Sequence, residues 1–401
     1  MRGLDIAPEL LAPAGSAVIA EAAFDHGADA VYVGFGQDNL RALLERAHSR
    51  GKKVYVTLNC IPDDAMLTRI ERTVAAIADM PRLPHAVIVS DPGVLTLCRK
   101  ELPAVAIHLS TQTGVFNAAA LRFWRDQGVA RIILPRELTL EQIGVCAAEQ
   151  GVETEMFVHG AMCVSISGRC LLGAYLDGRH PNKGDCTQPC RLRYRIDPID
   201  PLGTAADRWL EAEESAGGVF LMNSKDLCGL SLLPDIVKTG VHALKIEGRN
   251  KGIHYVVTVI RVYRAALDAC MADPSGFTVH KEWQRELDTV EHRPYTTGFY
   301  GGELQLQSVF ASKSEATARM AGIIKGILSD GAPVIDVRGV FRPGERLQVL
   351  PVNRKIIPYE TVFSSLTDLG GISLDQAPLN RLVVGRGVSP GFRQGDLLRK
   401  V

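Results

Sequence analysis

Four cysteines lie within 28 residues of this 401-residue chain, namely Cys163, Cys170, Cys186 and Cys190, with the spacing C-x6-C-x15-C-x3-C. Clustered thiols in a reducing compartment usually hold a metal or do redox chemistry instead of forming disulfides. The loops between them are longer than the paired knuckles of a zinc ribbon, so the spacing favours an iron–sulfur cluster over structural zinc. Burial as small hydrophobic residues is a poor account of four cysteines flanked by Gly, Arg, Asn, Lys and Asp.

Two of the other five cysteines, Cys60 and Cys228, could replace one of these four ligands. Cys60 follows a predicted strand, and Cys228 ends the polar run NSKDLC. The same run contributes Asn223 and Lys225 as candidate substrate-binding residues.

Polar side chains close most of the predicted strands, and they are the remaining candidates for chemistry: Asn59, Ser110, Gln112, Glu137, His159, Lys245, Glu247 and Arg249. Lys245, Glu247 and Arg249 alternate along one strand and therefore face the same way. A charge pointing into a barrel is costly unless it meets a partner or substrate. His159 could orient substrate, transfer a proton or ligate metal. Each of these residues could instead only satisfy loop backbone groups.

Two hydrolase motifs are missing. The chain has no H-E-x-x-H and no P-loop sequence. A Ser–His–Asp or Cys–His arrangement could still assemble from distant residues.

Eight apolar, β-branched runs must position these side chains, and helical stretches separate them. They are residues 9–14, 30–34, 53–59, 86–91, 106–112, 131–137, 154–160 and 243–249. Strands that are apolar throughout indicate a parallel sheet buried on both faces. Eight strand–helix units predict a (β/α)8 barrel, because no complete Gly-rich fingerprint supports a doubly wound sheet. The cysteines then fall in an insertion between strands 7 and 8, residues 161–242 approximately, above the carboxyl ends of the strands.

The pattern changes after about Ser308, where short strands alternate with Gly, Pro and Asp turns. This spacing predicts a small antiparallel β-barrel, so we expect two domains, 1–308 and 309–401. Residues 319–401 carry twelve Lys and Arg against seven Asp and Glu, whereas the whole chain has no net charge. A basic tilt of this kind is compatible with a nucleic-acid partner.

The overall composition is that of a globular protein, with 46% hydrophobic and 22% charged residues. No apolar run reaches the roughly 18 residues of a membrane span, and the first residues lack the apolar core of a signal peptide. We therefore expect a cytoplasmic protein without a membrane partner.

In combination, several motifs resemble the U32 family, long described as collagenase-like peptidases. They are ELLAPAG, LSTQ (Leu109 to Gln112), E-x-F-x2-G-A-M-C-x4-G-x-C (Glu155 to Cys170), GDCTQPCR, NSKDLC and KIEGR (Lys245 to Arg249). The C-terminal segment resembles the small barrel of longer members.

The resemblance implies RNA hydroxylation, and the chain looks most like the members that hydroxylate C5 of the tRNA wobble uridine. It implies a [4Fe–4S] cluster on Cys163, Cys170, Cys186 and Cys190, tRNA as partner, and a requirement for prephenate or a similar metabolite. The chain departs from the family pattern in one place: the segment after strand 2 is shorter than in other members, because VYVGF runs directly into GQDNLRALLERA. A peptidase and a non-catalytic RNA-binding or assembly protein are the competing hypotheses.

Overall fold

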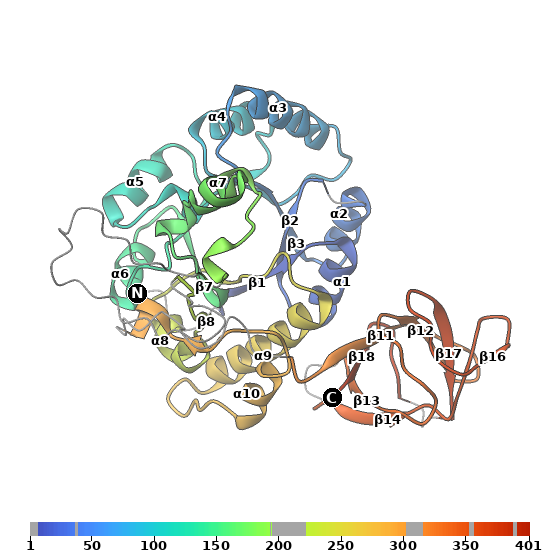
Figure 1. The fold of residues 1–401 in the computed structure, drawn as a ribbon. Helices are drawn as coiled ribbons and strands as arrows, with labels where there is room; N and C mark the ends of the chain where they lie inside the picture. Colours follow the sequence, from blue (N-terminus) through green and yellow to red (C-terminus); the bar gives the residue numbers. More distant parts are fainter. Residues whose placement is uncertain are drawn as a thin grey trace.

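A closed barrel of eight parallel strands forms the larger part of the protein (Figure 1). The computed structural model describes residues 7–36, 39–192, 194, 222–301, 316–352, 357–387 and 391–401. The predicted (β/α)8 fold is confirmed, because each strand pairs with the next and β9 pairs with both β7 and β1. The barrel strands are β1 (Glu9–Ala14), β2 (Ala30–Gly34), β3 (Lys53–Leu58), β4 (Ala86–Val89), β5 (Ala106–Leu109), β6 (Arg131–Ile133), β7 (Glu153–Ala161) and β9 (Ala243–Ile246).

Helices surround the barrel and bury one face against it. They are α1 (Ala17–Asp25), α2 (Leu40–Ser49), α3 (Asp64–Ala78), α4 (Pro92–Glu101), α5 (Ala118–Asp126), α6 (Leu140–Ala147), α8 (Leu233–Lys238) and α9 (Ile253–Ala272), with α10 (Lys281–Leu287) outside α9. Local capping sets several starts: Asp91 accepts from Val94 N–H with Pro92 in the first turn, and Thr139 with Gln142 forms a capping box.

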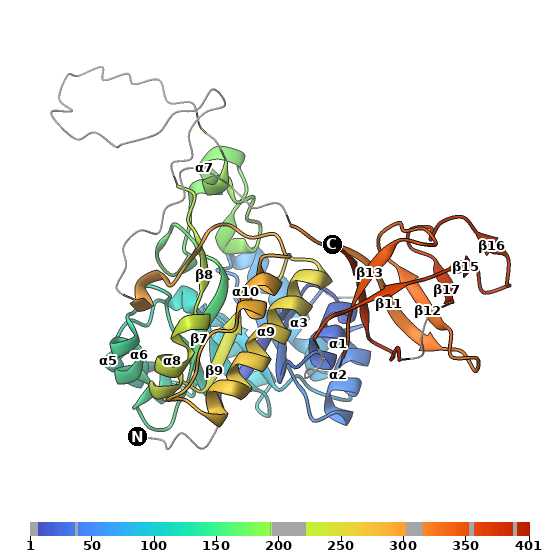
Figure 2. The same ribbon diagram turned by 90° about the horizontal axis from the view of Figure 1, so that it is seen from below.

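The chain leaves the barrel after β7 and runs above its carboxyl-terminal end (Figure 2). This insertion contains α7 (Leu172–Asp177) and all four clustered cysteines, as expected. It returns through β8 (Asp226–Cys228), which is antiparallel to β7, and β10 (Tyr295–Thr296) pairs with β8. Residue 193 and residues 195–221 of the insertion lie outside the described residues.

Buried charges fill part of the barrel interior. The set comprises Glu9 on β1, Arg131 on β6, Glu155 on β7 and Lys245 on β9, and we call it the interior ion network. Arg131 Nη1 is 2.7 Å from Glu9 Oε1 and 3.3 Å from Glu155 Oε2, and Lys245 Nζ is 2.9 Å from Glu155 Oε1. Burial opposes the charge on Arg131, but Glu155 and Glu9 outweigh it and raise its pKa.

The C-terminal part is an antiparallel, half-barrel sheet beside the main barrel, in strand order β14-β13-β18-β11-β12-β17-β15-β16. Its strands are β11 (Arg319–Ile327), β12 (Pro333–Val337), β13 (Arg346–Leu350), β14 (Tyr359–Val362), β15 (Ser365–Thr367), β16 (Ser373–Leu374), β17 (Leu382–Arg386) and β18 (Leu397–Lys400). The predicted boundary at residues 308 and 309 lies outside the described residues.

One buried arginine joins the C-terminal sheet to the barrel helices. Arg399 on β18 donates to Glu286 of α10 at 2.6 Å and to Thr289 at 3.1 Å. Leu350 and Leu397 also pack with Val257 of α9. Among the described residues, no helix is both long and apolar enough to cross a membrane.

The interior ion network gives a stability prediction. Glu155→Gln should lower the free energy of unfolding by about 3–5 kcal/mol, because it leaves Arg131 and Lys245 short of a buried counter-charge. Glu153→Gln, which removes a half-exposed partner of the same arginine, should cost less than about 1 kcal/mol. Urea unfolding of both variants measures the difference, and equal losses would contradict a buried network at this position.

Candidate functional site

A cavity of about 430 Å³ opens at the carboxyl ends of the barrel strands, where active sites of (β/α)8 barrels lie. We call it the mouth cavity. It contains six of the predicted residues, namely Asn59, Ser110, Gln112, Lys245, Glu247 and Arg249. The insertion closes one side with Gly168, Gln188 and Arg191. Gln37 and Asp38, in the short segment after β2, lie outside the described residues.

Amide and hydroxyl groups line one wall of the mouth cavity. Asn59 Nδ2 donates to Gln112 Oε1 at 3.0 Å, and Ser90 Oγ donates to the same oxygen at 3.1 Å. Ser110 Oγ is 3.4 Å from that oxygen and caps the short turn that carries Gln112. These bonds fix the Gln112 side chain and leave its amide nitrogen as a donor for a ligand.

Lys245 forms part of the cavity floor and belongs to the interior ion network at the same time. Its ammonium group lies 4.4 Å from the centre of the Tyr32 ring and 5.4 Å from that of Phe157. The ion pair with Glu155 compensates the charge of the lysine in its buried position. Lys245 can therefore attract an anion from below, but a role in proton transfer would have to break that pair.

Arg136 also lines the mouth cavity, although the sequence analysis did not single it out. Strand β6 ends at Ile133, so strict alternation no longer fixes the side-chain directions of the residues that follow. The Arg136 guanidinium lies 3.7 Å from the centre of the Phe157 ring and 3.5 Å from Glu247 Oε2. The predicted residue Glu247 therefore forms an ion pair with Arg136 in the wall of the mouth cavity.

Two arginines in the mouth cavity have no ion-pair partner within the part of the chain that the structure describes. Arg249 donates to the Thr57 hydroxyl at 3.0 Å, and Arg191 forms no ion pair among the described residues, although the charge of Asp226 partly compensates its own. Burial lowers the pKa of Arg191, and repulsion from Arg293 adds to the effect. Because burying a cation without full compensation is costly, the arrangement favours an anionic ligand beside these two side chains.

His159 does not line the mouth cavity. The register of β7 shifts between Phe157 and His159, and the imidazole turns toward α9, where its Nδ1 is 3.3 Å from the Tyr263 hydroxyl. Tyr255 and Tyr295 also surround the ring. Burial lowers the pKa of His159 to about 3, so the side chain is neutral at physiological pH. Its predicted role in catalysis has no support from this placement.

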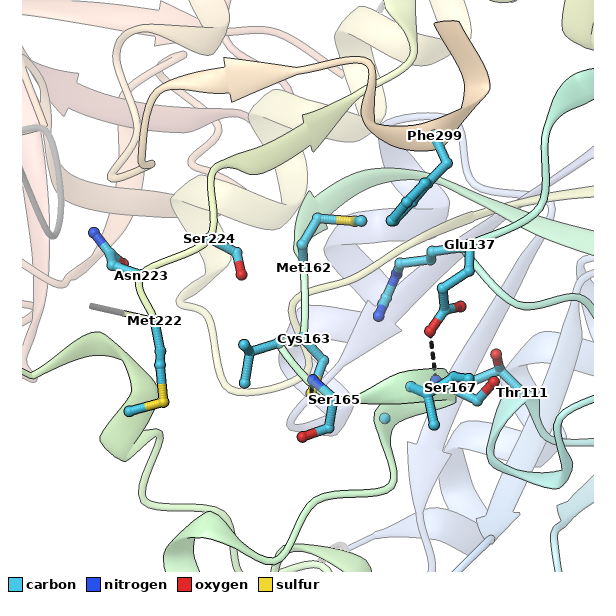
Figure 3. Close-up of a pocket in the computed structure, with 14 residues that line it drawn as sticks. Thr111, Glu137, Met162, Cys163, Ser165, Ser167, Met222, Asn223, Ser224 and Phe299 are labelled. Carbon is cyan, nitrogen blue, oxygen red and sulfur yellow. Dashed lines mark hydrogen bonds between the residues drawn. The ribbon is translucent and has the colours of Figure 1, made fainter. Parts of the chain in front are cut away.

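A second cavity of about 370 Å³ adjoins the first, and Figure 3 shows its lining. We call it the side cavity. It contains the predicted residues Glu137, Asn223 and Cys163, together with Phe299 and Met162. Lys225 lines neither cavity among the described residues.

The polar run NSKDLC is anchored by Arg293, a buried residue that the sequence interpretation missed. Arg293 Nη2 is 2.6 Å from Asp226 Oδ1, and its Nη1 donates to Asn223 Oδ1 at 3.2 Å. These contacts hold Asn223 in place at the edge of the side cavity. Arg293 stands in a short His-Arg-Pro segment before β10, where no pattern marks it as buried.

The four clustered thiols lie close enough to influence one another. Burial is the main cause that raises the pKa of Cys163, and the thiols of Cys170 and Cys186 raise it further. Burial also raises the pKa of Cys190, and the thiols of Cys163 and Cys186 contribute to the increase. Among the described residues, no three His, Cys, Asp or Glu side chains are close enough to hold a single metal ion.

Backbone donors already point at two of these sulfur atoms. Ser165 N–H donates to Cys163 Sγ at 3.4 Å, and Leu172 N–H donates to Cys170 Sγ at 3.3 Å. Cys228 is placed differently, because its thiol meets the Tyr263 hydroxyl on the helix side at 3.8 Å. Cys60 lies under the insertion, where a Cβ on Gly184 would be 3.6 Å from its sulfur.

Residues 15–309 match the family model described as Peptidase family U32. The chain is a member of this family. It is 35% identical over 98% of its length to "tRNA hydroxylation protein P1" of Bacillus subtilis (strain 168), of which 94% is covered. It is 36% identical over 73% of its length to "tRNA hydroxylation protein P" of Escherichia coli (strain K12), of which 74% is covered. A "Collagenase" of Porphyromonas gingivalis (strain ATCC BAA-308 / W83) is 30% identical, with 80% of each chain covered.

The low pKa of His159 gives a prediction about pH. The unfolded chain binds a proton at this residue below pH 6.5, whereas the folded chain does so only near pH 3, so acid favours unfolding. Lowering the pH from 7 to 5 should therefore remove about 2 kcal/mol of stability through this group. In His159→Gln the loss between pH 7 and 5, measured by urea unfolding, should be smaller by that amount. An identical pH dependence of the unfolding free energy in both proteins would contradict the burial of the His159 side chain.

Proposed function

We propose that this chain hydroxylates RNA, and that its substrate is the wobble uridine of tRNA, modified at C5. The proposal is supported by relatives named for tRNA hydroxylation, one of which aligns over nearly the whole chain. The observation in the structure that carries it is the position of the cysteine insertion, which lies above a cationic cavity at the carboxyl end of the barrel.

The four clustered thiols suit a [4Fe–4S] cluster. The donor set is all thiolate, backbone N–H groups are aimed at two of the sulfur atoms, and the thiols interact without converging on one ion. We propose Cys163, Cys170, Cys186 and Cys190 as the ligands. When bound, the cluster would supply redox or Lewis-acid chemistry beside the two cavities.

The mouth cavity suits a small organic acid such as prephenate. Five Lys and Arg side chains line it against two carboxylates. Arg191 and Arg249 are available for ion pairs with the ligand, and the Gln112 amide is available as a hydrogen-bond donor. The aromatic rings of Tyr32 and Phe157 would contact its carbon skeleton.

Exposed arginines of the C-terminal sheet suit the phosphate backbone of tRNA. Several of the basic residues in this segment pair with acidic neighbours, and Arg399 is buried against Glu286. The exposed arginines without an ion pair in the described part of the sheet are Arg319, Arg342, Arg346, Arg381 and Arg393. Their contacts with phosphates would make binding depend on salt.

A peptidase is the second candidate, because the family description and the collagenase relative both carry that activity. The cavities give it little support. Neither has a histidine in its described lining, so no thiol or hydroxyl there has an imidazole base. Hydrolysis of a protein substrate without RNA would favour this candidate over hydroxylation.

The cluster proposal predicts the metal content of a variant. Cys170→Ser should lose most of its iron, because a serine hydroxyl is a poor ligand for iron in a thiolate cluster. Iron and acid-labile sulfide are measured in protein purified without oxygen, with Cys98→Ser, a buried cysteine of α4, as the control. Stoichiometric zinc without sulfide in the wild type would contradict the proposal.

The function itself is tested in cells that lack their own copy of the gene. Wild type should restore 5-hydroxyuridine in tRNA nucleosides analysed by mass spectrometry, and Glu247→Gln should not. The variant should melt close to the wild-type temperature, because a partly exposed ion pair contributes at most about 1 kcal/mol. Glu149→Gln, which loses a similar arginine partner on the barrel surface, should behave as wild type.

Two results would contradict this account. If wild type does not restore the nucleoside, the chain is not the hydroxylase. If Glu247→Gln restores it fully, Glu247 has no part in the reaction.

A further inference from the structure

The side cavity differs from the mouth cavity in charge. Its lining contains one cation and one carboxylate, Arg136 and Glu137, and most of the remaining residues are apolar or carry a hydroxyl. A ligand with several negative charges would find little compensation there. The side cavity therefore suits a flat, uncharged group of moderate size better than an organic acid.

Two polar atoms in the lining of the side cavity have no partner within the described residues. Glu137 Oε1 accepts from Ser167 N–H at 2.5 Å, but Glu137 Oε2 is shielded from solvent and receives no hydrogen bond. The hydroxyl of Ser167 is also shielded and unpaired. Buried polar atoms without hydrogen-bond partners destabilise the protein, so a ligand that pairs with both would remove that penalty.

Ser167 has a strained backbone conformation, and this conformation brings its hydroxyl group and the Glu137 carboxylate into the same cavity wall. Its φ is 50°, in the left-handed region that non-glycine residues rarely adopt, and a left-handed Gly168 follows. This turn presents the Ser167 N–H to Glu137 and carries the hydroxyl in the same cavity wall. Strain held at a cavity wall is typical of a functional site.

Apolar side chains provide contact surfaces for a flat ring. Figure 3 shows Phe299 and Met162 along one edge of the side cavity, with Glu137 and Ser167 below them in this view. An aromatic ring and a thioether are good stacking partners for a nucleobase. Cys163 also lines the cavity, so a base held there would lie beside the clustered thiols.

We propose that the side cavity receives the extruded base of the RNA and that Glu137 and Ser167 read its edge. The Glu137 carboxylate accepts the N3–H of uracil, and the Ser167 hydroxyl donates to an adjacent carbonyl oxygen. Cytosine offers no N3–H, so this pair of groups selects uracil. The inference rests on the proposed function, and it assigns the base to the side cavity while the acid occupies the mouth cavity.

Arg136 separates the two ligands, since it lines both cavities. Its guanidinium is held against the Phe157 ring and beside Glu247. From this position it can donate to a carboxylate in the mouth cavity and to a base carbonyl in the side cavity, because a guanidinium has five donors. The two sites are therefore adjacent, and Arg136 can contact both ligands.

Binding of stem–loop RNAs tests the inference. Three stem–loop RNAs differ only at the loop position where the protein is proposed to hydroxylate uridine. They carry uridine, N3-methyluridine or cytidine at that position. Wild type should bind the uridine RNA about tenfold or more tightly than either of the other two, as expected for one hydrogen bond to a charged group. Glu137→Gln should reduce the preference for uridine over cytidine, because its amide can also donate to N3 of cytosine.

Two further variants serve as controls. Glu141→Gln, an exposed residue of α6, should keep the wild-type preference. Phe299→Leu should weaken binding of the uridine and cytidine RNAs alike, because it removes stacking and leaves the edge contacts intact. An unchanged uridine preference in Glu137→Gln, or equal binding of uridine and N3-methyluridine by wild type, would overturn the inference.

Hydroxylation of the uridine stem–loop separates this inference from the proposed function. If wild type hydroxylates the RNA and Glu137→Gln keeps the uridine preference, only the assignment of the base to the side cavity is wrong. If wild type binds with the predicted preference and forms no hydroxyuridine, the base site stands and the proposed reaction is wrong.

Discussion

The site depends on how the barrel neutralises the charges in its interior. Glu9, Arg131, Glu155 and Lys245 come from four strands, and each is held by a partner of opposite charge. Charges this deeply buried are tolerated only when they are paired and hydrogen-bonded. The network therefore fixes the strands that carry the cavity floor and determines where Lys245 points.

At the mouth the pairing is incomplete. Arg136 and Lys251 form ion pairs with carboxylates, while Arg191 and Arg249 form none within the described residues. Cations lining a concave, partly dry surface concentrate the electrostatic field there and attract anions. Because the insertion provides Arg191, and Cys190 directly precedes it, the segment that would hold the cluster also completes the cationic wall.

Most of the fold could be predicted from the sequence. The eight barrel strands were placed within a few residues, because strands buried on both faces are apolar throughout. Strands β8 and β10 were missed, since they have three and two residues and show no apolar run.

The site residues were predicted where a regular strand positions them, and missed elsewhere. Lys245 follows the alternation of β9 into the mouth cavity, and Glu247, directly after the end of that strand, lines it as well. His159 was misplaced because a register shift in β7 turns it toward α9. Arg191 and Arg293 were not singled out, because their burial depends on how the insertion folds over the barrel and no local pattern encodes it.

Calorimetry with prephenate most directly tests whether Arg191 and Arg249, at the mouth of the barrel, hold an organic acid. The cluster-loaded protein should bind the dianion, and added salt should weaken binding. Arg191→Gln and Arg249→Gln should each weaken it by about tenfold or more, as expected for loss of a charge-assisted hydrogen bond. Arg122→Gln, an exposed arginine of α5, should not change it. The absence of binding, or equal affinity in all four proteins, would contradict the account.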